Sequence, residues 1–343
     1  MKQPLSFLFG LIFMAISQVV LAAGPTYVKD PISVSTNWTK DNSPYVIQND
    51  IVVAKGAVLS LEPGVEVHFT TPANGKVGSG TNLVIQGGLK AVGNSTTPIS
   101  FVPAVQGSLW GAIFFYNADS LNCVMQGCMV KGGRIVCNGS SPTITQCAIY
   151  GAKSGVEVYA NSQPQIVGNR ITANGVGIYL YSDSANPTVS GNEIYNNNMG
   201  LFSREFGMPN ITGNKIYNNI QYNVVNYSTK TLSAPNNDFR SADAQQIART
   251  IYDGASNPSY GRVNFSPFVG MAAGQTGEVM ASAQPSASQE KPKVQEEDFW
   301  SYGRPFDAMK ISNVDQEKKK PSNAVKVLAV GATAVVTVVL LFL

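Results

Sequence analysis

The residues best suited to catalysis are two carboxylates and a guanidinium, those of Asp183, Glu205 and Arg204. Hydrolysis of a glycosidic bond requires two carboxyl groups about 5–9.5 Å apart, and active sites bring such titratable groups together. In the repeat alignment given below, Asp183 and Glu205 fall one position apart on neighbouring repeats, with Arg204 beside them. This trio is the candidate catalytic group of a polysaccharide lyase or glycoside hydrolase. Ordinary loop charges are the alternative interpretation.

Aromatic residues form a second candidate site, which would bind carbohydrate. Tyr159 and Tyr181 occupy matching positions of neighbouring repeats, Tyr179 and Phe202 lie beside them, and Glu157 flanks the group. An aromatic face packs against the apolar C–H face of a sugar ring, while nearby polar groups bond to its hydroxyls. The alternative is that tyrosine has a high strand propensity and stacks on exposed strands without any ligand.

The four cysteines allow two interpretations. Cys128 and Cys147 occupy the same position of neighbouring repeats, so their Cα atoms would lie close to the ~4.4–6.8 Å that a disulfide requires. An even number of cysteines in an exported domain favours such a bond. A file of reduced cysteines packed in the interior is the equal alternative. Cys123 and Cys137 are the remaining pair.

Composition excludes several classes of function. Charged residues make up only 13% of the chain and the net charge is +3, which is too little clustered positive charge for a nucleic-acid partner. His68 is the only histidine, which excludes His-rich zinc or copper sites, and its alternation with inward residues places it on a strand surface. Calcium-type Asp clusters and Met clusters are also missing from the sequence. We therefore expect no metal and no cofactor.

The elements that must position these residues repeat along the middle of the chain. Pro142, Pro164, Pro187 and Pro209 mark equivalent points, with spacings of 22, 23 and 22 residues. Each repeat contains short runs of alternating apolar and polar residues, the pattern of a half-buried strand. Units of this length bury their apolar faces by stacking, about 4.8 Å apart when strands pair. The expected inward files are Ile144, Ile166, Val189 and Ile211, and Ile149, Ile171, Ile194 and Ile216.

Asparagines recur at the turns of these repeats. Asn169, Asn192 and Asn214 each follow a glycine, and Asn197 and Asn219 recur half a turn later. Asparagine tolerates left-handed backbone, and stacked asparagines can hydrogen-bond from one coil to the next. The pattern predicts an all-β fold, a single-stranded parallel β-helix.

The repeats resemble those of bacterial secreted right-handed parallel β-helix proteins of the pectin-lyase-like superfamily. The likeness extends to SPYVIQNDIVVAKGAVLSLEPGVEVHF from Ser43, LVIQGGLKAVGNSTTPISFVPA from Leu83 and GSLWGAIFFYNADS from Gly107, and it covers residues 26–270. NNDFRSADAQQIARTIYDG resembles a closing coil with a short capping helix, expected over Ala242–Tyr252 with Ser241 as its N-cap. The His-Gly and Asp-Pro-His elements typical of hydrolases and epimerases of this superfamily do not occur, so the resemblance indicates the fold and not an activity.

The two ends of the chain predict its cellular location. Residues 1–23 have the charged start, apolar stretch and small-residue cleavage site of a secretory signal, with an uncleaved anchor as the alternative. Residues 271–320 are expected to be a flexible low-complexity linker that contains an aromatic and acidic segment, Glu296-Glu297-Asp298-Phe299-Trp300-Ser301-Tyr302. Residues 324–343 predict a transmembrane anchor, against the alternative of a buried strand or core helix.

Together these features predict a β-helix exported across the inner membrane and tethered to a membrane, on the periplasmic or cell-surface side. Its expected partner is a polysaccharide or an envelope protein, which it binds or scaffolds without catalysis. The alternative is an enzyme, a lyase, hydrolase or epimerase, acting on an acidic polysaccharide.

Overall fold

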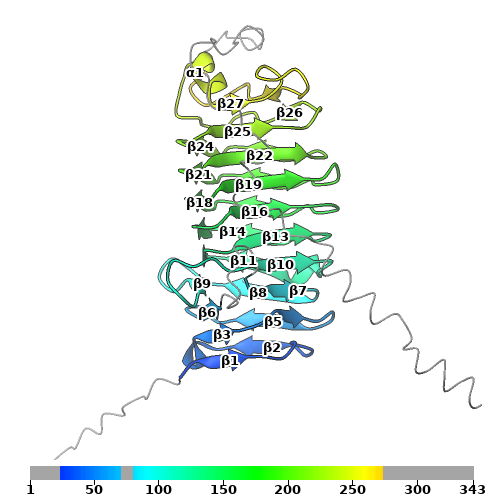
Figure 1. Ribbon diagram of the computed structural model, residues 1–343, viewed down its shortest axis with the longest axis vertical. Helices are drawn as coiled ribbons and strands as arrows, with labels where there is room; N and C mark the ends of the chain where they lie inside the picture. The colour runs from blue at the N-terminus through cyan, green and yellow to red at the C-terminus, as the bar shows by residue number, and fades with distance from the viewer. Residues whose placement is uncertain (1–23, 71–79, 273–343) are drawn as a thin grey trace, which may run out of the picture. The chain divides into compact units, whose positions relative to one another are not determined.

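The structure is a computed structural model that describes residues 24–70 and 80–272. Within these residues the chain winds into successive coils, and each full coil contributes one strand to each of three parallel sheets (Figure 1). Two sheets have nine strands and one has eight in the described part of the chain. Within each of these sheets, every strand except the first and the last pairs with its equivalents in the coil before and the coil after, which is the stacking that the 22-residue period predicts.

We number the sheets by the strands that form them. Sheet 1 contains β1 (Thr26–Val28), β3 (Tyr45–Ile47), β6 (Glu66–Phe69), β9 (Ile99–Pro103), β12 (Cys128–Lys131), β15 (Ala148–Tyr150), β18 (Arg170–Thr172), β21 (Glu193–Tyr195) and β24 (Lys215–Tyr217). Sheet 2 contains β4 (Ile51–Val53), β7 (Leu83–Ile85), β10 (Ala112–Tyr116), β13 (Arg134–Asn138), β16 (Ser154–Val158), β19 (Val176–Tyr181), β22 (Met199–Glu205), β25 (Tyr222–Asn226) and β27 (Ile251–Tyr252). Sheet 3 contains β2 (Thr36–Trp38), β5 (Val58–Leu61), β8 (Gly88–Val92), β11 (Cys123–Gln126), β14 (Thr143–Thr145), β17 (Gln165–Val167), β20 (Thr188–Ser190) and β23 (Asn210–Thr212). Two short helical turns, Lys40–Asn42 and Ser120–Asn122, lie between strands.

The core lies inside the coils, and both inward files expected from the sequence are confirmed. Ile144, Ile166, Val189 and Ile211 are direct partners along sheet 3. Ile149, Ile171, Ile194 and Ile216 are direct partners along sheet 1. All of them belong to one continuous cluster of buried apolar side chains. Like residues thus pack on like residues in these four coils.

Asparagines hold the corner between sheets 3 and 1. The Asn192 amide Nδ2 donates to the Ile166 carbonyl at 2.8 Å and to Oδ1 of Asn214 at 2.9 Å, and Oδ1 of Asn192 accepts from Nδ2 of Asn169 at 3.0 Å. The ladder continues to Asn237, one coil beyond the predicted file. A second ladder, at the corner between sheets 1 and 2, joins Asn174, Asn197, Asn219 and Asn223.

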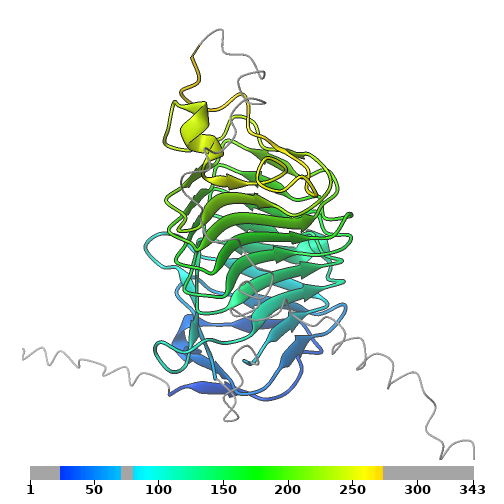
Figure 2. The ribbon, with the colours of Figure 1, turned by 45° about the horizontal axis from the view of Figure 1, so that its top comes forward.

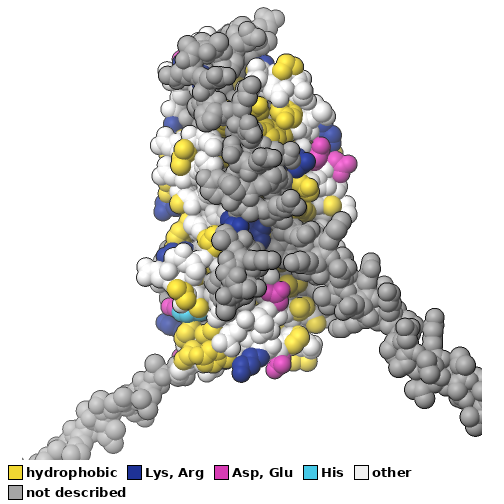
Figure 3. Space-filling view, viewed as in Figure 1, with side chains coloured by type: hydrophobic (Ala, Val, Ile, Leu, Met, Phe, Trp, Pro, Cys, Tyr) yellow, Lys and Arg dark blue, Asp and Glu magenta, His cyan; other side chains and the backbone are white. Residues whose placement is uncertain are grey.

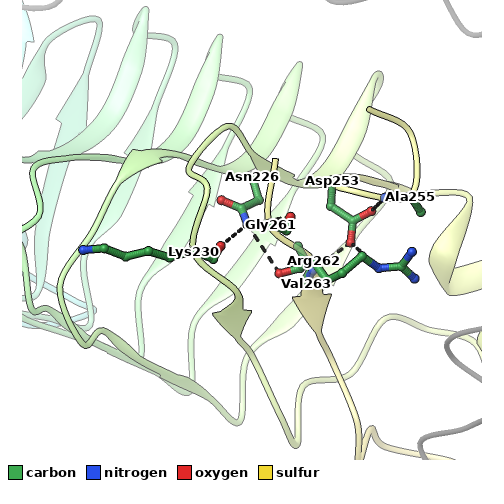
Figure 4. Close-up of polar contacts among 7 residues, drawn as sticks. All are labelled: Asn226, Lys230, Asp253, Ala255, Gly261, Arg262 and Val263. Carbon is green, nitrogen blue, oxygen red and sulfur yellow. Dashed lines mark hydrogen bonds and ion pairs between the residues drawn. The ribbon is translucent and has the colours of Figure 1, made fainter. Parts of the chain in front are cut away.

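The C-terminal end of the stack is closed by a loop with its own polar network (Figure 4). The Asn226 amide donates to the carbonyls of Lys230 and Gly261 at 2.9 and 3.0 Å. The buried carboxylate of Asp253 accepts from the backbone nitrogens of Ala255 and Val263 at 2.8 and 2.7 Å. These bonds satisfy backbone groups that a terminal coil would otherwise leave without a partner. They also bring β26 (Leu232–Ser233) beside β28 (Val263–Asn264).

The expected helix over Ala242–Tyr252 is shorter than predicted. Helix α1 spans Ala244–Ala248, and its N-cap is Asp243, whose carboxylate accepts from Gln245 N at 2.8 Å. Ser241 was the wrong cap, since its hydroxyl instead accepts from the backbone nitrogen of Asp243. The helix stops early because Ile251 is needed in β27, where it pairs with Val224. Figure 2 shows α1 at the end of the stack, where it covers the last coil.

Candidate functional site

The outer face of sheet 2 differs from the outer faces of the other two sheets. Seven side chains lie in direct register along it and point away from the interior; we call them the outer file. They are Val84, Phe114, Val136, Glu157, Tyr179, Phe202 and Val225. Their neighbours in the chain, such as Val156 and Val158, belong to the interior core cluster, but the outer file does not. Six of its seven members are apolar or aromatic.

The outer faces of the other two sheets carry more polar side chains than this one, although Tyr195 and Tyr217 stack on the outer face of sheet 1. On sheet 1, for example, Arg170, Glu193 and Lys215 follow one another, with Arg170 Nε 3.7 Å from Glu193 Oε2. Such exposed pairs contribute about 0–1 kcal/mol each and keep a surface soluble. An apolar outer face on one sheet alone is the mark of a surface that contacts something.

The aromatic residues predicted to bind carbohydrate are brought together on this face. The ring centroids of Tyr159 and Tyr181 lie 5.3 Å apart, those of Tyr179 and Tyr181 5.6 Å, and those of Tyr179 and Phe202 5.2 Å. Their exposure differs, however: Tyr179 and Phe202 are 1% and 3% exposed, whereas Tyr181 is 37% exposed. In the view of Figure 3, hydrophobic, basic and acidic side chains are interspersed on the part of the surface that is not drawn in grey.

The one charged member of the outer file, Glu157, is the centre of a buried polar cluster. Arg134 Nη1 on the neighbouring strand donates to Glu157 Oε1 at 3.2 Å, and both side chains are almost fully buried. The Ser154 hydroxyl donates to the same carboxylate oxygen, and the Tyr159 hydroxyl donates to Oε2 at 3.0 Å. Burial, together with the charge of Glu157, raises the pKa of Tyr159.

A second cation lies near this cluster. Burial lowers the pKa of the Lys153 ammonium, and repulsion from Arg134 lowers it further. Arg204 belongs to β22, two strands along the sheet from β16, which carries Glu157. It lies over the ring of Tyr181, with Cζ 5.7 Å from the ring centroid. The face thus combines aromatic rings with three cations, Arg134, Lys153 and Arg204, and with the carboxylates of Glu157 and Glu205.

The predicted catalytic trio lies where β19 and β22 end, and its catalytic role stays a prediction. A bulge in the pairing of β19 with β22 places Glu205 opposite Tyr181, two positions before Asp183. Both carboxylates are exposed, and the Asp183 carboxylate accepts a hydrogen bond from its neighbour Ser182 at 3.4 Å. The buried carboxylate on this face is Glu157 instead.

The predicted disulfide between Cys128 and Cys147 is not formed in the structure. Cys128 and Cys147 do lie in the same register position of neighbouring coils, but all four cysteines are free and buried, so no disulfide joins them. Directly aligned residues of parallel strands keep their Cβ atoms near the strand spacing of about 4.8 Å. A disulfide requires a Cβ separation of about 3.5–4.5 Å. The thiols instead donate to backbone carbonyls of the preceding coil, those of Ala91 and Met125, at 3.4 and 3.6 Å.

The comparison with known families agrees with this architecture. Residues 104–241 match the family described as "Right handed beta helix region". The chain is a right-handed β-helix repeat protein. No curated protein and no solved structure matches it. The β-helix fold supports a carbohydrate-related or scaffolding role in general. Because one fold can carry many functions, the choice among them depends on the residues of the site.

Sequence reasoning missed two members of the polar cluster in this β-helix repeat protein, Arg134 and Ser154. A signal was present, because strands buried on both faces read as continuous apolar runs. The segment of β10, Ala-Ile-Phe-Phe-Tyr, is such a run, and Arg134 interrupts the next one at its start. The alignment of four coils from Ser141 onward began after Arg134; Ser154 lay within it but was not singled out.

Three predicted segments lie outside the described residues: the signal 1–23, the anchor 324–343 and nearly all of the linker 271–320. Only the first two residues of the linker are described. Within residues 24–70 and 80–272, no helix has the length and apolar character needed to cross a bilayer.

Proposed function

We propose that this β-helix repeat protein is an exported, membrane-tethered component of the cell envelope that binds a glycan or another envelope component on the outer face of sheet 2. The observation that carries the proposal is the outer file itself. Aromatic and apolar side chains lie there beside one buried carboxylate–guanidinium pair, on regularly spaced strands. Binding sites for small molecules and sugars have this composition, a mostly apolar lining with a few placed polar groups.

Tyr181 is the residue through which a sugar ring would first contact this face. It is the most exposed of the clustered rings, and Tyr159 and Tyr179 flank it. Arg204 lies over the same ring and would donate to hydroxyl or carboxylate oxygens of an acidic sugar.

A binding assay with matched variants tests this proposal. Tyr181→Ala should weaken retention on immobilised envelope polysaccharide about tenfold, the equivalent of about 1.4 kcal/mol from one aromatic contact. Tyr195→Ala is the control, because Tyr195 stacks on Tyr217 in the same manner but on sheet 1. Equal retention of the wild type and Tyr181→Ala would contradict a binding site on this face. Equal loss of retention in Tyr181→Ala and Tyr195→Ala would contradict it as well.

Export and tethering require a separate test, because they depend on the sequence of the two ends. The mature protein should lack residues 1–23 by mass and should sediment with membranes. A variant that ends at Asn323 should be released as soluble protein. A full-length protein that retains residues 1–23 or is recovered in the cytoplasm would contradict this part of the proposal.

A further inference from the structure

The outer face of sheet 1 carries a file of tyrosines in which one position is occupied by a threonine. The direct partners at this position of β15, β18, β21 and β24 are Tyr150, Thr172, Tyr195 and Tyr217. They point outward, because the residue before each of them is an isoleucine of the interior cluster. All four are partly exposed to solvent. An aromatic ring is therefore present on three of these four strands and missing from β18.

The three tyrosines share one orientation. The Tyr150 hydroxyl donates to Met129 Sδ at 3.1 Å, and the Tyr217 hydroxyl donates to Glu193 Oε1 at 2.9 Å. In both cases the acceptor lies on the preceding strand, two residues before the direct partner of the tyrosine. The rings of Tyr195 and Tyr217 stack with centroids 5.4 Å apart and planes 6° apart. Tyrosines on consecutive strands of this face thus form a parallel stack.

Thr172 leaves a gap in this stack. Tyr150 and Tyr195 lie two strand spacings apart, which is about 10 Å. Among the described residues, no ring contact joins these two tyrosines, and the short side chain of Thr172 lies between them. We call the space between Tyr150 and Tyr195, above Thr172, the slot. A ring placed midway would lie about 5 Å from each tyrosine, which is within the range of aromatic pairs.

The charged side chains around the slot are mainly cations. The outward positions of β12, β15, β18, β21 and β24 hold three cations and one carboxylate, namely Lys131, Arg170, Lys215 and Glu193. Arg170 lies on the same strand as Thr172, two residues before it, and its side chain is 65% exposed. An excess of positive charge around a site attracts an anionic ligand.

We propose that the slot binds a planar aromatic acid, whose ring stacks between Tyr150 and Tyr195 in the place of the missing side chain. The carboxylate of the ligand faces Arg170, which donates charge-assisted hydrogen bonds to it. A flat ring suits the slot better than a puckered sugar ring, because the neighbouring tyrosines already stack in parallel. The slot lies on sheet 1, so this inference is separate from the glycan site proposed on sheet 2.

Cinnamate is a probe of this chemistry, and its binding to the full-length protein can be measured by saturation-transfer NMR. A ligand of this size should bind with a Kd of about 1 mM. Cinnamamide, which has the same shape without the charge, should bind about tenfold more weakly. Glucuronate, a charged but puckered ring, should also bind about tenfold more weakly. Absence of cinnamate binding, or tighter binding of glucuronate than of cinnamate, would overturn the proposal.

The decisive variant is Thr172→Tyr, which supplies the missing ring. It should extend the tyrosine stack, leave the melting temperature unchanged or higher, and weaken cinnamate binding at least tenfold. Ser190→Tyr is the matched control, because it adds a tyrosine to the outer face of sheet 3 and should leave cinnamate binding unchanged. Undiminished binding by Thr172→Tyr, or equal loss in both variants, would contradict the slot.

Two further variants keep the proposal testable if Thr172→Tyr does not fold. Tyr195→Ala removes one wall of the slot and should weaken cinnamate binding about tenfold. Thr172→Ser keeps the slot open and should bind cinnamate like the wild type. Wild-type affinity in Tyr195→Ala, or a tenfold loss in Thr172→Ser, would contradict the assignment.

Failure of this inference is distinguishable from failure of the proposed function. Tyr181→Ala should leave cinnamate binding unchanged, whereas Tyr195→Ala should leave glycan retention unchanged. A loss of cinnamate binding in Tyr181→Ala as large as that in Tyr195→Ala would refute a site confined to sheet 1. Cinnamate binding that depends on Tyr195 supports the slot whether or not sheet 2 retains glycan.

Discussion

Arg134 and Glu157 form an ion pair on neighbouring strands of sheet 2, with Arg134 Nη1 3.2 Å from Glu157 Oε1 and side chains that are 7% and 3% exposed. The pair faces outward from the β-helix, where exposed charges would ordinarily meet water. Its burial makes it a fixed polar element within an apolar surface. A buried charge that loses its partner keeps the full cost of desolvation.

Removing one partner of this pair should therefore destabilise the protein strongly. Glu157→Gln leaves the Arg134 guanidinium buried without its counter-charge and should lower the free energy of unfolding by about 3–5 kcal/mol. The measurement is the midpoint of urea denaturation. The control is Glu193→Gln, which breaks the exposed pair with Arg170 and should cost about 1 kcal/mol or less. Equal losses in the two variants would contradict the burial of the Glu157 pair.

The asparagine ladder should carry a large share of the stability of each coil. Asn192→Ala removes the acceptor of Asn169 and the donor to the Ile166 carbonyl, both buried, and should cost about 1–3 kcal/mol for each group left unsatisfied. Asn210→Ala, at an exposed position of β23, should change stability by about 0.5 kcal/mol or less. Thermal denaturation of both variants compares them directly. A melting temperature unchanged by Asn192→Ala would contradict a stabilising role of the ladder.

Most of the fold was predictable because it repeats. Pro142, Pro164, Pro187 and Pro209 fix the register of four coils, and every inward position follows from that alignment. The capping helix was predicted too long because Ile247 and Ile251 have helical spacing, yet Ile251 pairs with Val224 in a strand. Spacing within one segment cannot show that a strand partner competes for the same residue.

The cysteines should react only after unfolding. All four are buried and reduced, so iodoacetamide should modify none in the native protein and all four in denaturant without added reductant, as read by intact mass. Modification of only two cysteines in denaturant would show that a disulfide had formed. That result would restore the predicted bond between Cys128 and Cys147.

Stability should decline in alkaline solution. Burial raises the pKa of the Cys123 thiol from 9.0 to about 11, and burial also raises the pKa of Cys137. Because the folded state holds the Cys123 thiol protonated to a higher pH than the unfolded chain does, its contribution is complete below pH 9 and is lost between pH 9 and about 11. The melting temperature should fall across this range, and less steeply in a Cys123→Ala variant. If the melting temperature falls equally steeply with pH in the wild type and in Cys123→Ala, Cys123 does not cause the loss of stability.

The candidate site was only partly predictable. Tyr159, Tyr179, Tyr181, Phe202 and Glu157 were grouped by register, and the structure does bring them together. Their burial was not foreseeable, because alternation within one strand identifies the outward face but not what lies over it. Arg134 was missed since its role depends on an outward neighbour one coil away in space and 23 residues away in the chain.

Methyl NOEs in an isoleucine-labelled, otherwise deuterated sample test the stacking of coils most directly. The register that defines the outer file also places Ile149, Ile171, Ile194 and Ile216 one above another. Strong cross-peaks should join consecutive members of this file, about 4.8 Å apart per coil. The peak between Ile149 and Ile194, two coils apart, should be far weaker. Strong contacts between alternate members, or no contacts between consecutive ones, would contradict the β-helix and the surface inferred from it.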